Sequence, residues 1–249
     1  DLIRMKFVIH PPFLYAYRIA KSTGLLEWEP IKILVEKVYF FYKRYLEAPG
    51  FKFLQPFVKP DTWVVDVGAN IGYFTSMAVK WVEGNVSVIA IEPEPENLGR
   101  LHKRVTRLGI EKTVDIISAA ATDREGFCRL VLNRNHPGDH RLGAHGLKVR
   151  ALKLDSLMDK SDEIEFSLIK IDVQGAEMSV LRGAKELLHR DHPTLLIEID
   201  DAALRQFGSS AAELMAFLVD FGYTPYQVTS IGISPLPTNE RLVIGETRY

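Results

Sequence analysis

Residues 62–72, which read TWVVDVGANIG, decide the fold. Thr62 to Val67 is a short, mostly apolar run rich in β-branched residues, which is typical of a strand buried on both faces of a sheet. Glycines at 68 and 72 follow it and predict a tight turn. A helical stripe then begins, formed by Ile71, Phe74, Thr75, Ala78 and Val82. A buried strand, a glycine turn and a helix are together typical of an open α/β sheet.

The same alternation of apolar runs and helical patterns repeats along the chain. Further strands are predicted at residues 86–91 (VSVIAI), 114–120 (VDIISAA), 166–171 (FSLIKI) and 194–199 (TLLIEI). A helix is predicted at about 94–108, and another after the fourth strand, where Ala176, Val180, Ala184 and Leu187 share one face. Apolar strands separated by amphipathic helices predict a parallel sheet with helices on both faces.

An insertion is predicted before the fourth strand. FCRLVLN at 127–133 and LKVRALKL at 147–154 alternate with a period of two around a polar loop at 135–146, which predicts an antiparallel hairpin. After the fifth strand, Ser210 and Glu213 have the spacing of a capping box, which predicts a helix that buries Leu214, Leu218 and Phe221. Two late strands are predicted at about 224–229 and 241–245.

The first 60 residues differ from the rest and are expected to form an N-terminal helical cap on a main domain that covers 61–249. A short strand is predicted at 5–9. A helix is predicted at 31–46, with an apolar stripe formed by Ile31, Leu34, Val35, Val38, Phe41, Tyr42 and Tyr45. Burial of this stripe against the body of the protein is the favoured interpretation. Docking on a membrane surface is the alternative, because the stripe is flanked by Lys32, Lys37, Lys43 and Arg44.

Composition limits the classes of function. The chain has 249 residues, of which 47% are hydrophobic and 25% charged, as expected for one large globular domain. Its formal net charge of −1 argues against a nucleic-acid partner. The single cysteine, Cys128, excludes an internal disulfide and favours a reducing, cytoplasmic compartment. No apolar run has the roughly 20 residues of a membrane span. The chain begins at Asp1 instead of Met, which leaves open a signal or anchor removed upstream.

Candidate ligand-binding residues follow the first two strands, at the carboxyl ends where open parallel sheets bind their ligands. They are Asp66, Gly68, Asn70 and Gly72 in the turn and Glu92 at the end of the second strand. The Glu92 carboxylate suits the two hydroxyls of a ribose. A dinucleotide site favours the spacing GxGxxG, whereas this turn reads GANIG. Asp66 would repel a pyrophosphate but attract the ammonium and sulfonium of S-adenosylmethionine, so the turn favours S-adenosylmethionine as the cofactor.

Three separated motifs resemble a known family: DVGANIGYF at 66–74, IEPEP at 91–95 and IKIDVQGAE at 169–177. From about residue 61 onward the chain resembles the FkbM family of S-adenosylmethionine-dependent methyltransferases. The resemblance implies a class I methyltransferase-like (Rossmann-like) fold, with a mostly parallel seven-stranded sheet whose last strand is antiparallel. It also implies O-methylation of a hydroxyl on a polyketide, sugar or lipid-linked acceptor. The turn residues just named would hold the methionine part of the cofactor, and Glu92 its ribose.

One position departs from the family pattern, and it affects the choice of catalytic residue. The family usually shows Asp-Val-Glu-Gly after the fourth strand, whereas this chain has Gln174 in third place. A neutral amide cannot act as a base, so we expect the base elsewhere.

An alcohol acceptor must lose its proton during methyl transfer, which requires a general base. Asp172 ends the fourth strand and is expected to share an edge of the sheet with Asp66, to contact the cofactor and to act in catalysis. An aspartate there also suits a helix cap. Glu177 is a second catalytic candidate, although the helix dipole alone favours a carboxylate at its position. His140 in the inserted loop is a third.

Other polar residues have structural as well as functional interpretations. Glu198 lies in an apolar strand, so its charge needs a partner or access to the site. Arg141 is a candidate anchor for an acidic acceptor. His136, Asp139 and His145 lie in the same inserted segment, but their spacing matches no zinc pattern, so no metal site is expected.

The favoured function is S-adenosylmethionine-dependent methyl transfer to a hydroxyl of a small molecule, sugar or lipid-linked glycan. Two other interpretations stay open. An NAD-dependent oxidoreductase on a related fold is disfavoured by Asp66 together with Asn70. A catalytically inactive, methyltransferase-like binding module stays open because of Gln174.

Overall fold

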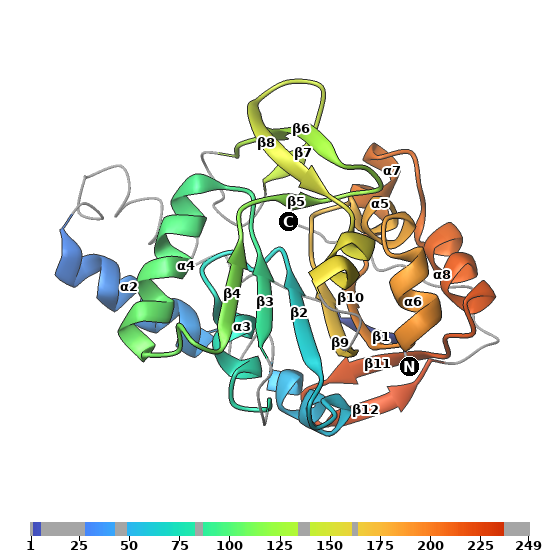
Figure 1. Cartoon of the computed structure of the whole chain (residues 1–249), viewed down its shortest axis with the longest axis horizontal. Helices are drawn as coiled ribbons and strands as arrows, with labels where there is room; N and C mark the ends of the chain where they lie inside the picture. The colour runs from blue at the N-terminus through green and yellow to red at the C-terminus, as the bar shows by residue number, and fades with distance from the viewer. Residues whose placement is uncertain are drawn as a thin grey trace.

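The computed structural model describes residues 2–5, 28–42, 49–82, 87–133, 140–160 and 164–236. At its centre is an eight-stranded sheet in which neighbouring strands are parallel, except for the antiparallel pair β11 and β12. The predicted open and mostly parallel sheet is confirmed. In spatial order the strands are β12 (Gly232–Pro235), β11 (Pro225–Thr229), β1 (Leu2–Met5), β10 (Thr194–Glu198), β9 (Phe166–Ile171), β2 (Trp63–Val67), β3 (Val88–Ile91) and β4 (Val114–Ile117) (Figure 1).

The strand order reverses between β2 and β9. The chain runs outward from β2 through β3 to β4, then crosses back to β9 and continues to β10. Val67 of β2 pairs with Ile91 of β3 and with Ile171 of β9, so the three strands end level with one another. Open α/β sheets bind ligands beyond the carboxyl ends of their strands at such a reversal. The fold therefore places the candidate site here.

Helices cover both faces of the sheet, as predicted. Successive strand residues point to opposite faces. Val65 and Ile169 therefore pack on one side with α5, α6 and α8, whereas Val64 and Leu168 pack on the other with η3 and α3. Burial on both faces is why these strands are apolar throughout. The helices are α2 (Glu29–Tyr42), η3 (Pro49–Phe57), α3 (Tyr73–Ala78), α4 (Pro95–Leu108), η4 (Leu154–Lys160), α5 (Glu177–Arg182), α6 (Lys185–Asp191), α7 (Asp201–Gln206) and α8 (Ala211–Asp220).

The insertion forms a second, smaller sheet beyond the carboxyl ends of β2 and β3 (Figure 1). β6 and β8 pair in antiparallel fashion, which confirms the predicted hairpin. The inner face of this sheet carries a buried cluster of Ala120, Leu130 and Val149. The four strands, in spatial order, are β5 (Ala120–Ala121), β8 (Leu147–Leu152), β6 (Gly126–Val131) and β7 (Arg141–Leu142).

The expected seven strands and N-terminal helical cap are not confirmed. A strand is present at Leu2–Met5, where it pairs with both β10 and β11, whereas residues 6–9 of the strand predicted at 5–9 lie outside the described residues. Because this strand is part of the main sheet, the first 60 residues are not a cap alone, and the described part of the sheet has eight strands.

The C-terminal part of the main sheet differs from the prediction in its last strand. The strand predicted at 224–229 is confirmed as β11, and a turn at 230–231 then lets the chain double back as the antiparallel β12. The strand predicted at 241–245 lies outside the described residues. The Ser210 hydroxyl accepts a hydrogen bond from the Glu213 amide at 3.2 Å, so the predicted N-cap of α8 is confirmed.

Helix α2 contacts the main domain through Phe40. The Arg104 guanidinium lies 3.6 Å from the centre of the Phe40 ring, and the Tyr73 ring lies 5.4 Å from it. Ile31 and Val35 of the predicted apolar stripe are half-buried, and Leu34, Val38 and Phe41 are exposed, so the expected burial of that stripe is not confirmed.

No helix in the described ranges is both long and apolar enough to cross a bilayer.

A pair of glycine substitutions tests the packing between the two sheets. Gly183 separates α5 from α6, and a Cβ there would overlap the carbonyl oxygen of Thr122, whereas a Cβ on Gly99 in α4 would meet open space. We expect Gly183→Ala to lower the free energy of unfolding by about 1–3 kcal/mol through overpacking. Gly99→Ala should raise it by about 0.5–1 kcal/mol through helix propensity. Urea denaturation measures both, and equal effects would contradict the packing at Gly183.

Candidate functional site

A buried lysine joins the carboxyl ends of β2 and β9. The Lys170 ammonium of β9 lies 3.2 Å from Oδ1 of Asp66 and 3.4 Å from Oδ2 of Asp172. It also donates a hydrogen bond of 2.8 Å to the carbonyl oxygen of Gly68. Lys170 is 7% exposed and Asp66 is fully buried. A buried charge is costly unless it is paired, so each of these groups depends on the others.

Asp66, a predicted cofactor ligand, has partners inside the protein on both carboxylate oxygens. Its Oδ2 accepts a 2.6 Å hydrogen bond from the Thr75 hydroxyl, and its Oδ1 faces the Lys170 ammonium. The Asp66 carboxylate is therefore paired inside the protein, and its role as a cofactor ligand stays a prediction. Lys170 was missed because it reads as one polar residue in an apolar strand, FSLIKI. Its position two residues before Asp172, on the strand beside Asp66, was the available signal.

The turn from Gly68 to Gly72 is shaped by backbone contacts. The amides of Gly68 and Ala69 both donate to the carbonyl oxygen of Ile91, at 3.0 Å. Gly68 has a φ of 74°, and a Cβ there would overlap the backbone carbonyl of Asp172. Only glycine combines a positive φ with room for the Asp172 carbonyl. Because these amides are already bonded, they are not available to a pyrophosphate, which agrees with the argument from the spacing of the glycines.

Glu92, the predicted ribose ligand, lies at the end of β3 and braces this turn. Its Oε2 accepts from the Asn70 amide at 2.7 Å, and its Oε1 accepts from the Glu94 amide at 2.9 Å. Burial raises the pKa of the Glu92 carboxyl to about 7, although both hydrogen bonds oppose that rise. Asn70 itself adopts the left-handed conformation, with φ 51°. Within the described ranges no hydrogen bond occupies the side-chain amide of Asn70, which suits it to contact a ligand.

Lys170, Asp66 and Asp172 together form what is here called the lysine cluster. Asp172, the predicted catalytic residue, is the member of this cluster that reaches the surface. Its side chain is 24% exposed, whereas those of its two neighbours in the cluster are almost completely covered. Its Oδ1 accepts a 3.1 Å hydrogen bond from Nε2 of Gln174, which lies 3.4 Å from Oε2 of Glu198. The structure therefore brings Asp66 and Asp172 together at one edge, as expected, through Lys170.

Gln174 explains how this chain accommodates two carboxylates on neighbouring strands. Its neutral amide donates to both Asp172 and Glu198, which gives Glu198 the partner that its apolar strand requires. A glutamate at 174 would place a third carboxylate between them. In this chain the Gln174 amide thus has a carboxylate acceptor on each side, Asp172 and Glu198.

The side chain of Glu177, the second catalytic candidate, points back toward the loop at 173–175 that precedes it. It is 2% exposed, and its Oε1 accepts hydrogen bonds from the amides of Val173 and Gly175, at 3.2 and 3.1 Å. Burial raises the pKa of the Glu177 carboxyl to about 7. These contacts favour a role in holding the loop at 173–175.

His140 and Arg141 lie at the small sheet. The His140 Nδ1 accepts from the Asn133 amide at 3.1 Å, and Arg141 donates to Gln206 of α7 at 2.6 Å. Arg141 thus ties the insertion to the main domain. His136 and Asp139 lie outside the described residues. Among the residues that are described, no three His, Cys, Asp or Glu side chains gather as metal ligands.

Comparison with known proteins identifies the family. The family model described as the methyltransferase FkbM domain matches residues 66–225, which include the turn, Glu92 and the lysine cluster. The chain belongs to the FkbM methyltransferase family. The class I methyltransferase type of α/β fold is thereby established, with the strand order given above.

Three individual proteins are similar to this FkbM-family chain. The AMB antimetabolite synthetase AmbE of Pseudomonas aeruginosa is 28% identical over 57% of this chain and 8% of its own length. The crystal structure of methyltransferase FkbM from Methylobacillus flagellatus KT is 22% identical, with a TM-score of 0.47, and covers 68% of this chain and 40% of that one. A SAM dependent methyltransferase from Aquifex aeolicus is 18% identical, with a TM-score of 0.45, and covers 78% and 88%. The chain thus spans less than half of the length of the first two.

Removing the buried lysine tests whether the cluster supports the fold of this FkbM-family methyltransferase. Lys170→Met leaves Asp66 buried without its counter-ion, so we expect a loss of about 3–5 kcal/mol in the free energy of unfolding. The double variant Asp66→Asn/Lys170→Met should recover part of this loss, because the orphan charge is removed. Lys185→Met, at an exposed lysine of α6, is the control and should change stability by less than about 0.5 kcal/mol. Urea denaturation gives each value, and equal stabilities of Lys170→Met and the control would refute the role of the cluster.

Proposed function

We propose that this methyltransferase uses S-adenosylmethionine to methylate a hydroxyl of a small molecule, sugar or lipid-linked glycan. The observation that carries the proposal is Asp172. It is a partly exposed carboxylate at the carboxyl end of β9, fixed by Lys170 and Gln174 beside the glycine turn of β2. A carboxylate so placed suits the removal of a proton from an alcohol.

The residues at the ends of β2 and β3 fit the cofactor. Glu92 already accepts two amide hydrogen bonds, and a carboxylate has further lone pairs for the two hydroxyls of a ribose. The side-chain amide of Asn70 is available to the methionine part, and the turn at 68–72 brings backbone close to it. When bound, S-adenosylmethionine supplies a methyl group on a sulfonium that is already activated for displacement.

The chain's own residues then have to align the acceptor and take up its proton. The Asp172 carboxylate receives the hydroxyl proton as the new C–O bond forms. Lys170 and Gln174 hold this carboxylate in one orientation. Asp66 contributes by holding Lys170. Glu177 and His140 are further from this role, because each already binds backbone amides.

A catalytically inactive binding module is the second candidate function. Gln174 is the observation that favours it, because the family usually has a glutamate there. Since the Gln174 amide orients Asp172, we propose that the substitution preserves activity. An NAD-dependent oxidoreductase is disfavoured by membership of a methyltransferase family.

Titration with S-adenosylhomocysteine tests the cofactor site. Ribose hydroxyls favour the Glu92 carboxylate anion, so binding should lower its pKa from about 7. We therefore expect affinity to weaken as the pH falls below 7, with release of a proton on binding. Glu92→Gln should bind about 10- to 100-fold more weakly and lose this pH dependence. Calorimetry in two buffers of different ionisation enthalpy measures both effects.

The controls for this titration are NAD and an exposed glutamate. Glu96→Gln, on the surface of α4, should bind S-adenosylhomocysteine like the wild type. Binding of NAD without binding of S-adenosylhomocysteine would refute the cofactor assignment. Unchanged affinity and pH dependence in a folded Glu92→Gln variant would remove Glu92 from the site.

Asp172→Asn tests the chemical step. The amide keeps the size of the side chain but cannot accept the proton, so methyl transfer to alcohol and sugar acceptors should fall by about 100-fold or more. Binding of S-adenosylhomocysteine should remain within about tenfold of the wild type. Transfer of labelled methyl groups is the measurement, and Asp220→Asn at the exposed end of α8 is the control. Full activity in Asp172→Asn would exclude Asp172 as the base.

A further inference from the structure

The charge of the chain is distributed unevenly, although its total is close to zero. Residues 126–154, which contain the small-sheet insertion, carry six Lys and Arg and a single Asp, a formal charge of +5. Because the whole chain carries −1, the remainder carries −6. A charge separated in this way is typical of a surface that binds an anionic partner.

Three of the five described cations in this segment lie together on the outer face of the small sheet. Residues that pair across antiparallel strands share a face. Arg129 pairs with Lys148, and Phe127 pairs with Arg150, and all four side chains are exposed. Val131 continues the same face along β6. No carboxylate lies among the residues described in strands β6 and β8.

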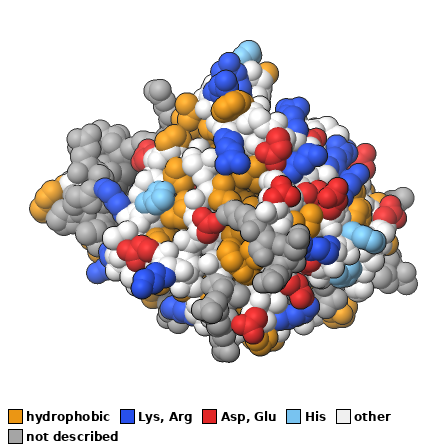
Figure 2. All heavy atoms as spheres, viewed as in Figure 1, with side chains coloured by type: hydrophobic (Ala, Val, Ile, Leu, Met, Phe, Trp, Pro, Cys, Tyr) orange, Lys and Arg blue, Asp and Glu red, His pale blue; other side chains and the backbone are white. Residues whose placement is uncertain are grey.

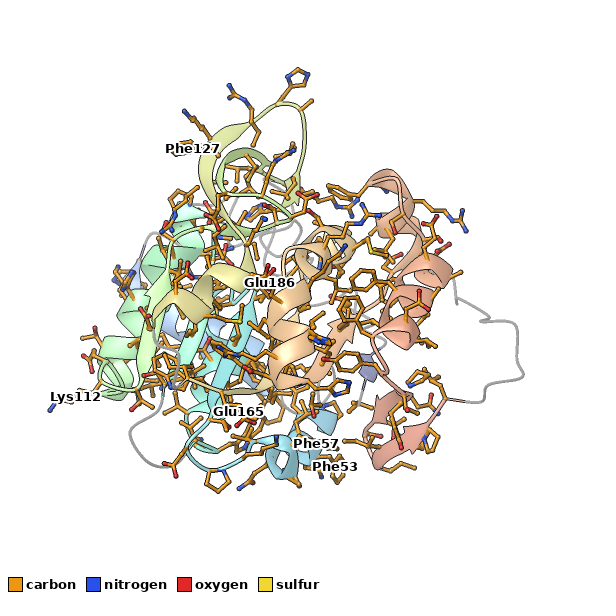
Figure 3. The ribbon with its side chains drawn as sticks, turned by 45° about the vertical axis from the view of Figure 1, so that its right-hand side comes forward. Phe53, Phe57, Lys112, Phe127, Glu165 and Glu186 are labelled. Atoms are coloured by element: carbon orange, nitrogen blue, oxygen red, sulfur yellow. The ribbon has the colours of Figure 1, made fainter. Side chains whose placement is uncertain are left out.

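Apolar side chains are exposed among these cations. Phe127 is 64% exposed and Val131 is 44% exposed, and the Lys148 ammonium lies 4.1 Å from the centre of the Phe127 ring. Figure 2 shows Lys and Arg in blue and hydrophobic side chains in orange at the top of the molecule, over the small sheet. Figure 3 shows Phe127 at the outer side of this sheet. A protein surface rarely exposes large apolar groups together unless it binds a partner.

We propose that the outer face of the small sheet, formed by Phe127, Arg129, Val131, Lys148 and Arg150, docks on an anionic lipid surface. Cations attract the anionic headgroups, while the aromatic and aliphatic side chains enter the boundary between headgroups and acyl chains. Single-stranded nucleic acid is less suited, because such sites stack successive bases on several aromatic rings and this face has one.

The position of this face relates the docking to the candidate site. The small sheet lies beyond the carboxyl ends of β2 and β3, the same end of the main sheet as Asp172 and Glu92 (Figure 1). Arg141 joins it to α7. Docking would therefore hold the site near the lipid surface. A site held there would have access to a lipid-linked acceptor. This consequence rests on the proposed function, whereas the docking itself does not.

Vesicle sedimentation tests the docking without any methyl transfer. The whole chain should bind vesicles of phosphatidylserine and phosphatidylcholine at low salt, and bind pure phosphatidylcholine vesicles at least tenfold more weakly. Each cation near an anionic surface contributes roughly fivefold in affinity, so the triple variant Arg129→Gln/Lys148→Gln/Arg150→Gln should lose on the order of 100-fold. Phe127→Ala should lose about tenfold.

A matched variant distinguishes loss of binding through the small-sheet face from loss of binding through a change in net charge. Lys80→Gln/Lys112→Gln/Lys185→Gln removes three charges from exposed lysines elsewhere and should bind within about threefold of the wild type. Equal loss in the two triple variants would overturn the assignment to the small sheet. Absence of binding to the anionic vesicles would overturn the proposal itself. Retardation of an RNA oligonucleotide through the same three cations, without vesicle binding, would replace the lipid by a nucleic acid.

Discussion

The ion pair between Lys170 and Asp66 is the interaction on which the site depends. Two neighbouring parallel strands each place a charged side chain in the interior, and neither charge is tolerable without the other. The same ammonium binds the carbonyl of Gly68 and approaches Asp172. One buried cation thereby sets the positions of the glycine turn after β2 and of the carboxylate after β9, the two elements on either side of the point where the strand order reverses.

The carboxylates of the site differ in role because they differ in surroundings. Asp66 is fully buried and paired with Lys170. Glu92 is buried and tied to two amides, with a pKa raised to about 7, which suits a group that exchanges a proton when a ligand binds. Asp172 alone of the lysine cluster is partly open to solvent. Gln174 lies between Asp172 and Glu198 and prevents two like charges from facing each other directly.

The two sheets differ in burial and in the role that each is inferred to have. The main sheet is buried on both faces and fixes the site, whereas the small sheet is buried on its inner face alone and leaves a basic, partly apolar outer face. Gly183 and Arg141 connect the two parts, one by close packing against Thr122 and the other by a hydrogen bond to α7. The position of the outer face relative to the site is therefore fixed by the fold.

The sequence alone determined the order of the strands along the chain, the glycine turn, the inserted hairpin and the residues near the reversal point, because periodicity and local turn chemistry act over a few residues. Tertiary structure alone decided which charges meet. In the sequence Lys170 is an isolated polar residue of an apolar strand, and only the placement of β9 beside β2 brings it to the Asp66 carboxylate. The place of β1 in the main sheet was equally hidden, because its neighbours β10 and β11 are about 190 and 220 residues away in the chain. Long-range pairing depends on the register of the whole sheet, which no local pattern of residues encodes.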